Sequence, residues 1–67
     1  MMITVDEVRA EVAKITSMVG DPEMAHSAED YLWEAVLSAI ASGAADAQEL
    51  ATEALKTSDI EFPRWYA

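Results

Sequence analysis

The chain has a single histidine, which stands among carboxylates at a spacing that would suit acid–base or metal chemistry. His26, Glu29 and Asp30 follow one another at positions i, i+3 and i+4, which share a face of a continuous helix. A histidine beside a carboxylate can act as a general base, and the group could weakly hold a metal ion. The sequence has no second histidine, cysteine or glycine-rich phosphate loop to complete such a site. We therefore interpret His26 and Glu29 as structural and expect no cofactor, keeping an enzyme or metal protein centred on His26 as an alternative.

The composition fits one small domain over residues 1–67. The 67 residues are 52% hydrophobic and include no cysteine, so no disulfide can stabilise a chain near the lower size limit for an unaided core. The core must be efficient for its size, or a second copy or a partner must extend it. No apolar run approaches the roughly 20 residues of a membrane span, and the N-terminus lacks the features of a signal peptide. We expect a cytoplasmic protein.

The negative charge of the chain is concentrated in its middle. The formal net charge is −9, and no lysine or arginine occurs between Lys14 and Lys56. The acids of that stretch are Asp21, Glu23, Glu29, Asp30, Glu34, Asp46, Glu49 and Glu53. Binding to a phosphate backbone needs cations, which argues against direct binding of nucleic acid. The simplest interpretation is a solvated, solubilising face, and the functional alternatives are a basic partner protein or mimicry of DNA phosphates.

The N-terminal part of the chain predicts a helix over residues 5–19. Thr4 and Glu7 have the spacing of a capping box, in which each residue caps the other. Apolar residues then recur every three or four positions, as on one face of a helix. That stripe is Val5, Val8, Val12, Ile15 and Val19. Gly20 is expected to end the helix as a C-terminal cap.

A second helix is predicted over residues 22–42. Asp21 and Pro22 form a helix-start signal, although a start at Ala28 after Ser27 is also open. Gly43 is expected to end it. Its apolar residues cover so broad an arc that we expect neighbours to cover it from two directions. The arc consists of Tyr31, Leu32, Trp33, Ala35, Val36, Leu37, Ala39, Ile40 and Gly43.

A third helix is predicted over residues 47–56, preceded by a second capping box of Asp46 and Glu49. Its inward side should be small because it is rich in alanine: Ala47, Leu50, Ala51, Ala54 and Leu55. Residues 57–67 form a tail in which Pro63 prevents regular helix. The sequence thus predicts an all-α fold, a compact three-helix bundle closed by an aromatic C-terminal tail.

The tail holds three of the five aromatic residues, Phe62, Trp65 and Tyr66. An alanine-rich third helix leaves apolar surface uncovered, so we expect the tail to fold across the first two helices as a lid, with Phe62 and Trp65 structural. A docking peptide is the alternative. Arg64 could pair with Glu29, Asp30 or Glu34, contributing at most about 1 kcal/mol at the surface. It could instead anchor an interface, where tryptophan, tyrosine and arginine are enriched.

Two stretches carry a family resemblance. "AHSAEDYLWEAVLSAIASGA" (25–44) and "LATEALKTSDIEFPRWYA" (50–67) resemble small uncharacterised proteins of actinobacterial bacteriophages and prophages. The matching positions are His26, Glu29, Asp30, 39–41, Gly43, 54–57, Ile60, Phe62, Arg64 and Trp65. They cover a little over half of the chain. The resemblance implies a phage-derived or actinobacterial accessory protein, in the host cytoplasm if a phage encodes it, and brings no known activity or catalytic residue.

These observations predict a non-enzymatic protein-binding module that acts on a host protein, with a basic protein as one candidate partner. The expected interaction residues are Glu23, Asp30, Glu34, Trp33, Arg64 and Tyr66. An acidic nucleic-acid mimic that inhibits a DNA- or RNA-binding protein is the alternative. Homodimerisation through the apolar stripe of residues 5–19 is compatible with each of these functions.

Overall fold

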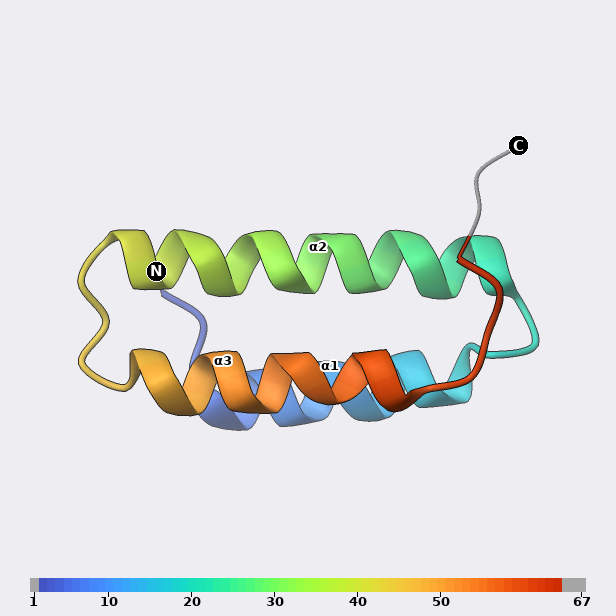
Figure 1. The fold of residues 1–67 in the computed structure, drawn as a ribbon, viewed down its shortest axis with the longest axis horizontal. Coiled ribbons are helices and arrows are strands. Elements are labelled where there is room, and N and C mark those ends of the chain that lie inside the picture. Colours follow the sequence, from blue (N-terminus) through green and yellow to red (C-terminus); the bar gives the residue numbers. More distant parts are fainter. Residues whose placement is uncertain (1, 65–67) are drawn as a thin grey trace.

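The structure, a computed structural model, describes residues 2–64, which form a bundle of three α-helices. The helices are α1 (Val5–Ser17), α2 (Pro22–Ala41) and α3 (Ala47–Leu55), and a 3₁₀ turn, η1 (Lys56–Asp59), follows α3. In Figure 1, α1 and α3 lie side by side on the same side of α2, and α2 runs antiparallel to both. The predicted all-α three-helix bundle is confirmed.

The core is a single apolar cluster in which all three helices meet. Each helix contributes residues spaced three or four apart, as a helical stripe requires. The buried apolar residues are Val8, Ile15, Ala25, Leu32, Val36, Ala39, Leu50, Ala54 and Phe62. The α1 stripe is therefore used within the monomer: Val8 and Ile15 are fully buried, and Val5 and Val12 pack against the core. A homodimer would have to use a different face.

The two ends of α1 compare differently with the sequence prediction. The capping box at its start is confirmed, because Thr4 Oγ1 accepts from the Glu7 amide at 3.2 Å and Glu7 Oε1 accepts from the Thr4 amide at 2.9 Å. The helix ends at Ser17, two residues early, and the cap predicted at Gly20 is wrong. A tight turn ends it instead, in which the Met18 amide donates to the carbonyl of Ile15 at 2.9 Å.

The bounds of α2 follow its start and stop signals. Asp21 accepts from the Met24 amide at 3.2 Å and Pro22 is the first helical residue, which settles the choice of start in favour of Pro22. At the other end Gly43 has φ +92°, and its amide donates to Ile40 at 3.0 Å. The Ala44 amide bonds to Ala39 at 3.1 Å, which completes a Schellman motif.

Replacing each of the two glycines, Gly20 and Gly43, with alanine should change the free energy of unfolding in opposite directions. A Cβ at either position would meet no atom within 4 Å, so the two sites differ only in their backbone conformation. At Gly43, where φ is +92°, the left-handed conformation should make Gly43→Ala cost about 1 kcal/mol of unfolding free energy. Gly20→Ala should instead add about 0.5 kcal/mol by restricting the unfolded chain. Urea unfolding followed by circular dichroism measures both, and equal effects would contradict this description of the α2 end.

The start of α3 differs from the prediction. Asp46 precedes the helix, but its side chain makes no capping hydrogen bond, so the second capping box is wrong. Its backbone carbonyl accepts from the Leu50 amide at 3.0 Å, which begins the helical ladder. After Leu55 the backbone tightens into η1, so the α-helix ends one residue before the predicted bound at Lys56.

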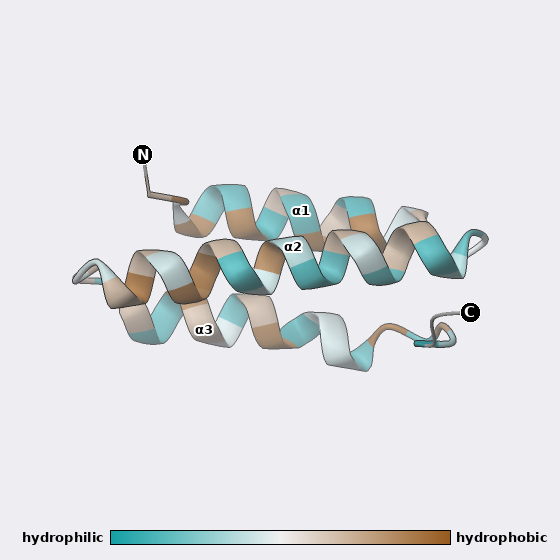
Figure 2. Ribbon diagram, turned by 90° about the horizontal axis from the view of Figure 1, so that it is seen from above, coloured by the Kyte–Doolittle hydropathy of each residue, from teal (hydrophilic) through white to brown (hydrophobic). Residues whose placement is uncertain are grey.

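The broad apolar arc of α2 has two neighbours, α1 and α3, as its width led us to expect. Because α1 and α3 lie on the same side of α2, the opposite side of the helix has no neighbour among residues 2–64 (Figure 1). At the two edges of the covered side, Tyr31 next to α1 is 79% exposed and Leu37 next to α3 is 65% exposed. Figure 2 shows that hydrophobic residues gather in the C-terminal half of α2. Even so, no helix within residues 2–64 has the length and hydropathy to cross a membrane.

Candidate functional site

The histidine and carboxylates that share a helical spacing do not form one site. α2 is continuous through them, and His26 Nε2 lies 3.6 Å from Asp30 Oδ1. Glu29 turns toward the core and binds Arg64 instead. Within residues 2–64, no cluster of three or more histidine, aspartate or glutamate side chains could hold a metal ion. The described geometry therefore gives no support to chemistry centred on His26.

Arg64 holds the end of the described chain against α2. Its Nε donates to Glu29 Oε1 at 2.9 Å and its Nη2 to Oε2 at 3.1 Å, a two-pronged pair. The same Nη2 donates to the carbonyls of Thr57 at 2.7 Å and Ile60 at 3.0 Å. The guanidinium carbon lies 4.0 Å from the centre of the Phe62 ring. We call this group, Glu29 with Thr57, Ile60, Phe62 and Arg64, the arginine latch.

The latch is more deeply placed than the surface pair that the sequence predicted. The Glu29 side chain is only 7% exposed, and that of Arg64 is 32% exposed. The hydrogen bond to Glu29, together with its charge, raises the pKa of Arg64, so the guanidinium stays charged. Phe62 is buried at 8% exposure, as the lid prediction requires of it. Trp65 and Tyr66 lie outside the described residues, so the lid as a whole stays a prediction.

Trp33 combines a structural hydrogen bond with an exposed ring. Its indole Nε1 donates to Thr57 Oγ1 at 2.9 Å and to the carbonyl of Ala54 at 3.3 Å, while the residue remains 38% exposed. Thr57 is fully buried and contacts both Trp33 and Arg64. Sequence reasoning missed Thr57, because nothing in its local pattern distinguishes it from its neighbours in the tail.

An apolar groove lies between α2 and α3, next to Trp33. Its lining is entirely hydrophobic: Trp33, Val36, Leu37, Ile40, Ala51, Ala54 and Leu55. Leu37 is 65% exposed and Leu55 is 56% exposed. The prediction that Leu55 faces inward is therefore wrong, since only Leu50 and Ala54 of α3 are buried. We call these seven residues the α2–α3 groove.

An acidic face of α2 borders this groove. Glu23, Asp30 and Glu34 are all exposed, and their spacings of seven and four residues put them along one side of the helix. Asp30 and Glu34 each lie three residues before a groove residue, Trp33 and Leu37, and are thus their surface neighbours. The three predicted acidic interaction residues therefore share one face, which adjoins the predicted contact Trp33.

The four basic residues of the chain are already engaged in ion pairs. Arg64 binds Glu29, and Lys14 lies 3.2 Å from Glu11. The other two meet at Glu53, where Lys56 Nζ lies 2.9 Å and Arg9 Nε 3.4 Å from Oε1. The Lys56 hydrogen bond and the two positive charges lower the pKa of Glu53. None of these four pairs involves Glu23 or Glu34, and Asp30 lies 3.6 Å from His26 on the same helix.

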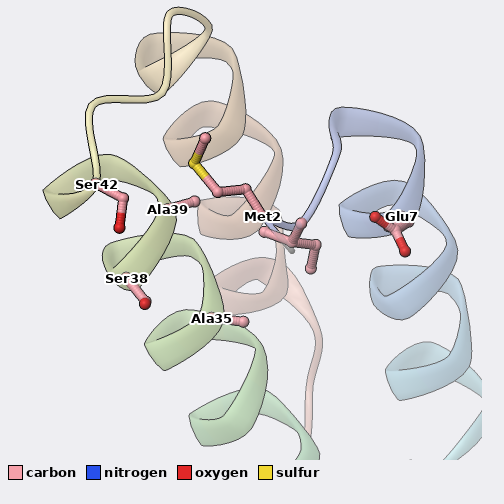
Figure 3. A pocket seen from close by; sticks show the side chains of 7 residues that line it. Met2, Glu7, Ala35, Ser38, Ala39 and Ser42 are labelled. Carbon is pink, nitrogen blue, oxygen red and sulfur yellow. The ribbon is translucent and has the colours of Figure 1, made fainter.

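A second hollow lies between the N-terminal segment and α2. Figure 3 shows Ala35, Ser38, Ala39 and Ser42 in a row along α2, with Met2 beside them and Glu7 across from them on α1. The Glu7 carboxylate is engaged by the Thr4 amide. The rest of the lining is small or apolar, and we assign no chemistry to this hollow.

Comparisons with known proteins add no further assignment. No protein-family model matches the chain, and neither the curated proteins nor the solved structures gave a match. The resemblance to actinobacterial phage proteins therefore stays a prediction.

Proposed function

We propose that this chain is a small non-enzymatic protein-binding module, a phage-derived accessory factor that acts on a basic protein of the host cytoplasm. The carrying observation is the exposed apolar α2–α3 groove beside the acidic face of α2. Apolar contact area supplies affinity, and charge of one sign selects and steers a partner. The two features lie side by side and together support a protein-binding surface.

The groove also favours this proposal over a nucleic-acid mimic. A mimic of phosphates would present acids to the basic surface of its target and would gain little from exposed leucines. Leu37 and Leu55 are both more than half exposed, although a chain of this size needs most of its apolar side chains for its core. Their position next to Asp30 and Glu34 supports a partner that brings apolar and basic groups together.

The proposed function is tested by affinity capture from an actinobacterial lysate with mass-spectrometric identification. The bait is compared with an Asp30→Asn/Glu34→Gln variant and with a control, Glu11→Gln/Glu49→Gln, that removes the same charge elsewhere. All variants must first show the wild-type circular dichroism spectrum. A specific protein captured by wild type and control, and lost with the acidic-face variant, supports the proposal. No capture above background by the wild type would contradict it.

A further inference from the structure

We infer that the α2–α3 groove binds an amphipathic basic helix of the partner, with an apolar stripe in the groove and lysines or arginines over the acidic face. This inference rests on the proposed function and names the class of partner. Helix-in-groove binding uses apolar residues at i, i+3, i+4 and i+7, which match an elongated groove between two helices. The groove has that form because it follows residues 33–40 of α2 and 51–55 of α3.

The apolar half of the argument comes from the packing of the groove. Val36 and Ala54 form its floor and are buried, whereas Leu37 and Leu55 stand exposed on its two sides. Trp33 closes one end, held in place by its hydrogen bonds to Thr57 and Ala54. A fixed indole with two flanking leucines is a preorganised apolar site, and preorganisation lowers the entropic cost of binding.

The charge half of the argument decides the occupant. The side of the groove toward the outer face of α2 carries Asp30 and Glu34, and Lys56, which begins η1 directly after α3, is bound to Glu53. A second copy of this chain would bring its own net charge of −9 to the same place. Like charges at an interface are unfavourable. A basic helix instead brings charge opposite to that of the chain, whose formal net charge is −9.

The experiment is a calorimetric titration with two synthetic peptides. Each has about 18 residues, with leucines at helical i, i+3, i+4, i+7 spacing and either lysine or glutamate elsewhere. The full-length chain should bind the lysine peptide and not the glutamate peptide. Leu37→Ala/Leu55→Ala should weaken binding about tenfold, because two central apolar contacts are lost. The control Tyr31→Ala removes an apolar side chain that is 79% exposed on α2 but outside the groove, and should change affinity by less than about twofold.

The charge contribution is separated from the apolar one by salt. Asp30→Asn/Glu34→Gln should weaken the lysine peptide about threefold at low salt, more than Glu11→Gln/Glu49→Gln does, and the difference should shrink as salt screens the charges. If the double alanine variant does not fold, Leu37→Lys replaces it, since a lysine there repels the same peptide.

Three results would overturn the inference. Equal losses with the groove variant and Tyr31→Ala would mean non-specific binding. Binding of the glutamate peptide as tightly as the lysine peptide would remove the charge argument. Concentration-dependent dimerisation in sedimentation velocity, abolished by Leu37→Lys, would identify a second copy as the occupant. The two proposals can fail separately. A lysate protein that is lost with the acidic-face variant but still captured by Leu37→Ala/Leu55→Ala would support the proposed function and overturn the inference about the groove.

Discussion

Replacing Arg64 with methionine should lower the free energy of unfolding by about 3 kcal/mol. The change leaves the Glu29 carboxylate, whose side chain is 7% exposed, without its two-pronged partner. It also removes the donor to the carbonyls of Thr57 and Ile60. Breaking a buried pair on one side usually costs 3–5 kcal/mol, and the partial exposure of Arg64 places the expectation at about the lower end. A domain of this size is stable by on the order of 5 kcal/mol, so most of that stability should disappear.

The matched control is Arg9→Met, the same substitution at an exposed pair. The Arg9 side chain is 57% exposed and lies 3.5 Å from Asp6 and 3.4 Å from Glu53. Exposed pairs of this kind contribute less than about 1 kcal/mol. Urea unfolding of both variants gives the comparison. Similar losses for Arg9→Met and Arg64→Met would show that the arginine latch is only another surface pair.

Replacing Leu50 with alanine should cost about 3 kcal/mol, within the range for leucine truncation in a core. Leu50 is fully buried where the three helices meet. The lost side chain leaves a cavity that three packed helices cannot fully close. Leu55→Ala is the matched control, since it is the same change on the same helix at a residue that is 56% exposed. It should cost less than about 1 kcal/mol.

Chemical denaturation of the two leucine variants decides which face of α3 is inside. If Leu55→Ala cost as much as Leu50→Ala, α3 would be rotated relative to the described bundle, and Leu55 would belong to the core as the sequence suggested. If the difference is as expected, Leu55 is available for binding. The stability measurement and the groove experiment therefore depend on the same orientation of α3.

The helices themselves could be predicted because their signals are local. The capping box of Thr4 and Glu7, the start at Pro22 and the stop at Gly43 each act within a few residues. The same kind of signal failed at Gly20 and Asp46. A turn involving Met18 had already ended the first helix, and the Asp46 backbone conformation gives no side-chain cap. A capping residue type permits a cap without requiring one.

The candidate site could be predicted only in part, because it depends on how the helices pack. The acids of α2 share a face by spacing alone, and that grouping followed from the sequence. The exposure of Leu37 and Leu55 depends on how α2 and α3 pack against each other, which no helical period encodes. The pairing of Arg64 with Glu29 required the tail to return to α2 across thirty-five positions of sequence. The expectation that Trp65 and Tyr66 join Phe62 in the lid stays a prediction.

The most direct test of the account is an NMR titration of the ¹⁵N-labelled wild-type chain with the lysine peptide. The indole N–H of Trp33 is hydrogen-bonded at the edge of the groove, so its cross-peak reports on contact there. We predict that this cross-peak and the amides of Leu37 and Leu55 shift most. Shifts spread evenly over the acidic surface, or centred on Tyr31 and α1, would contradict the assignment of the groove as the binding site.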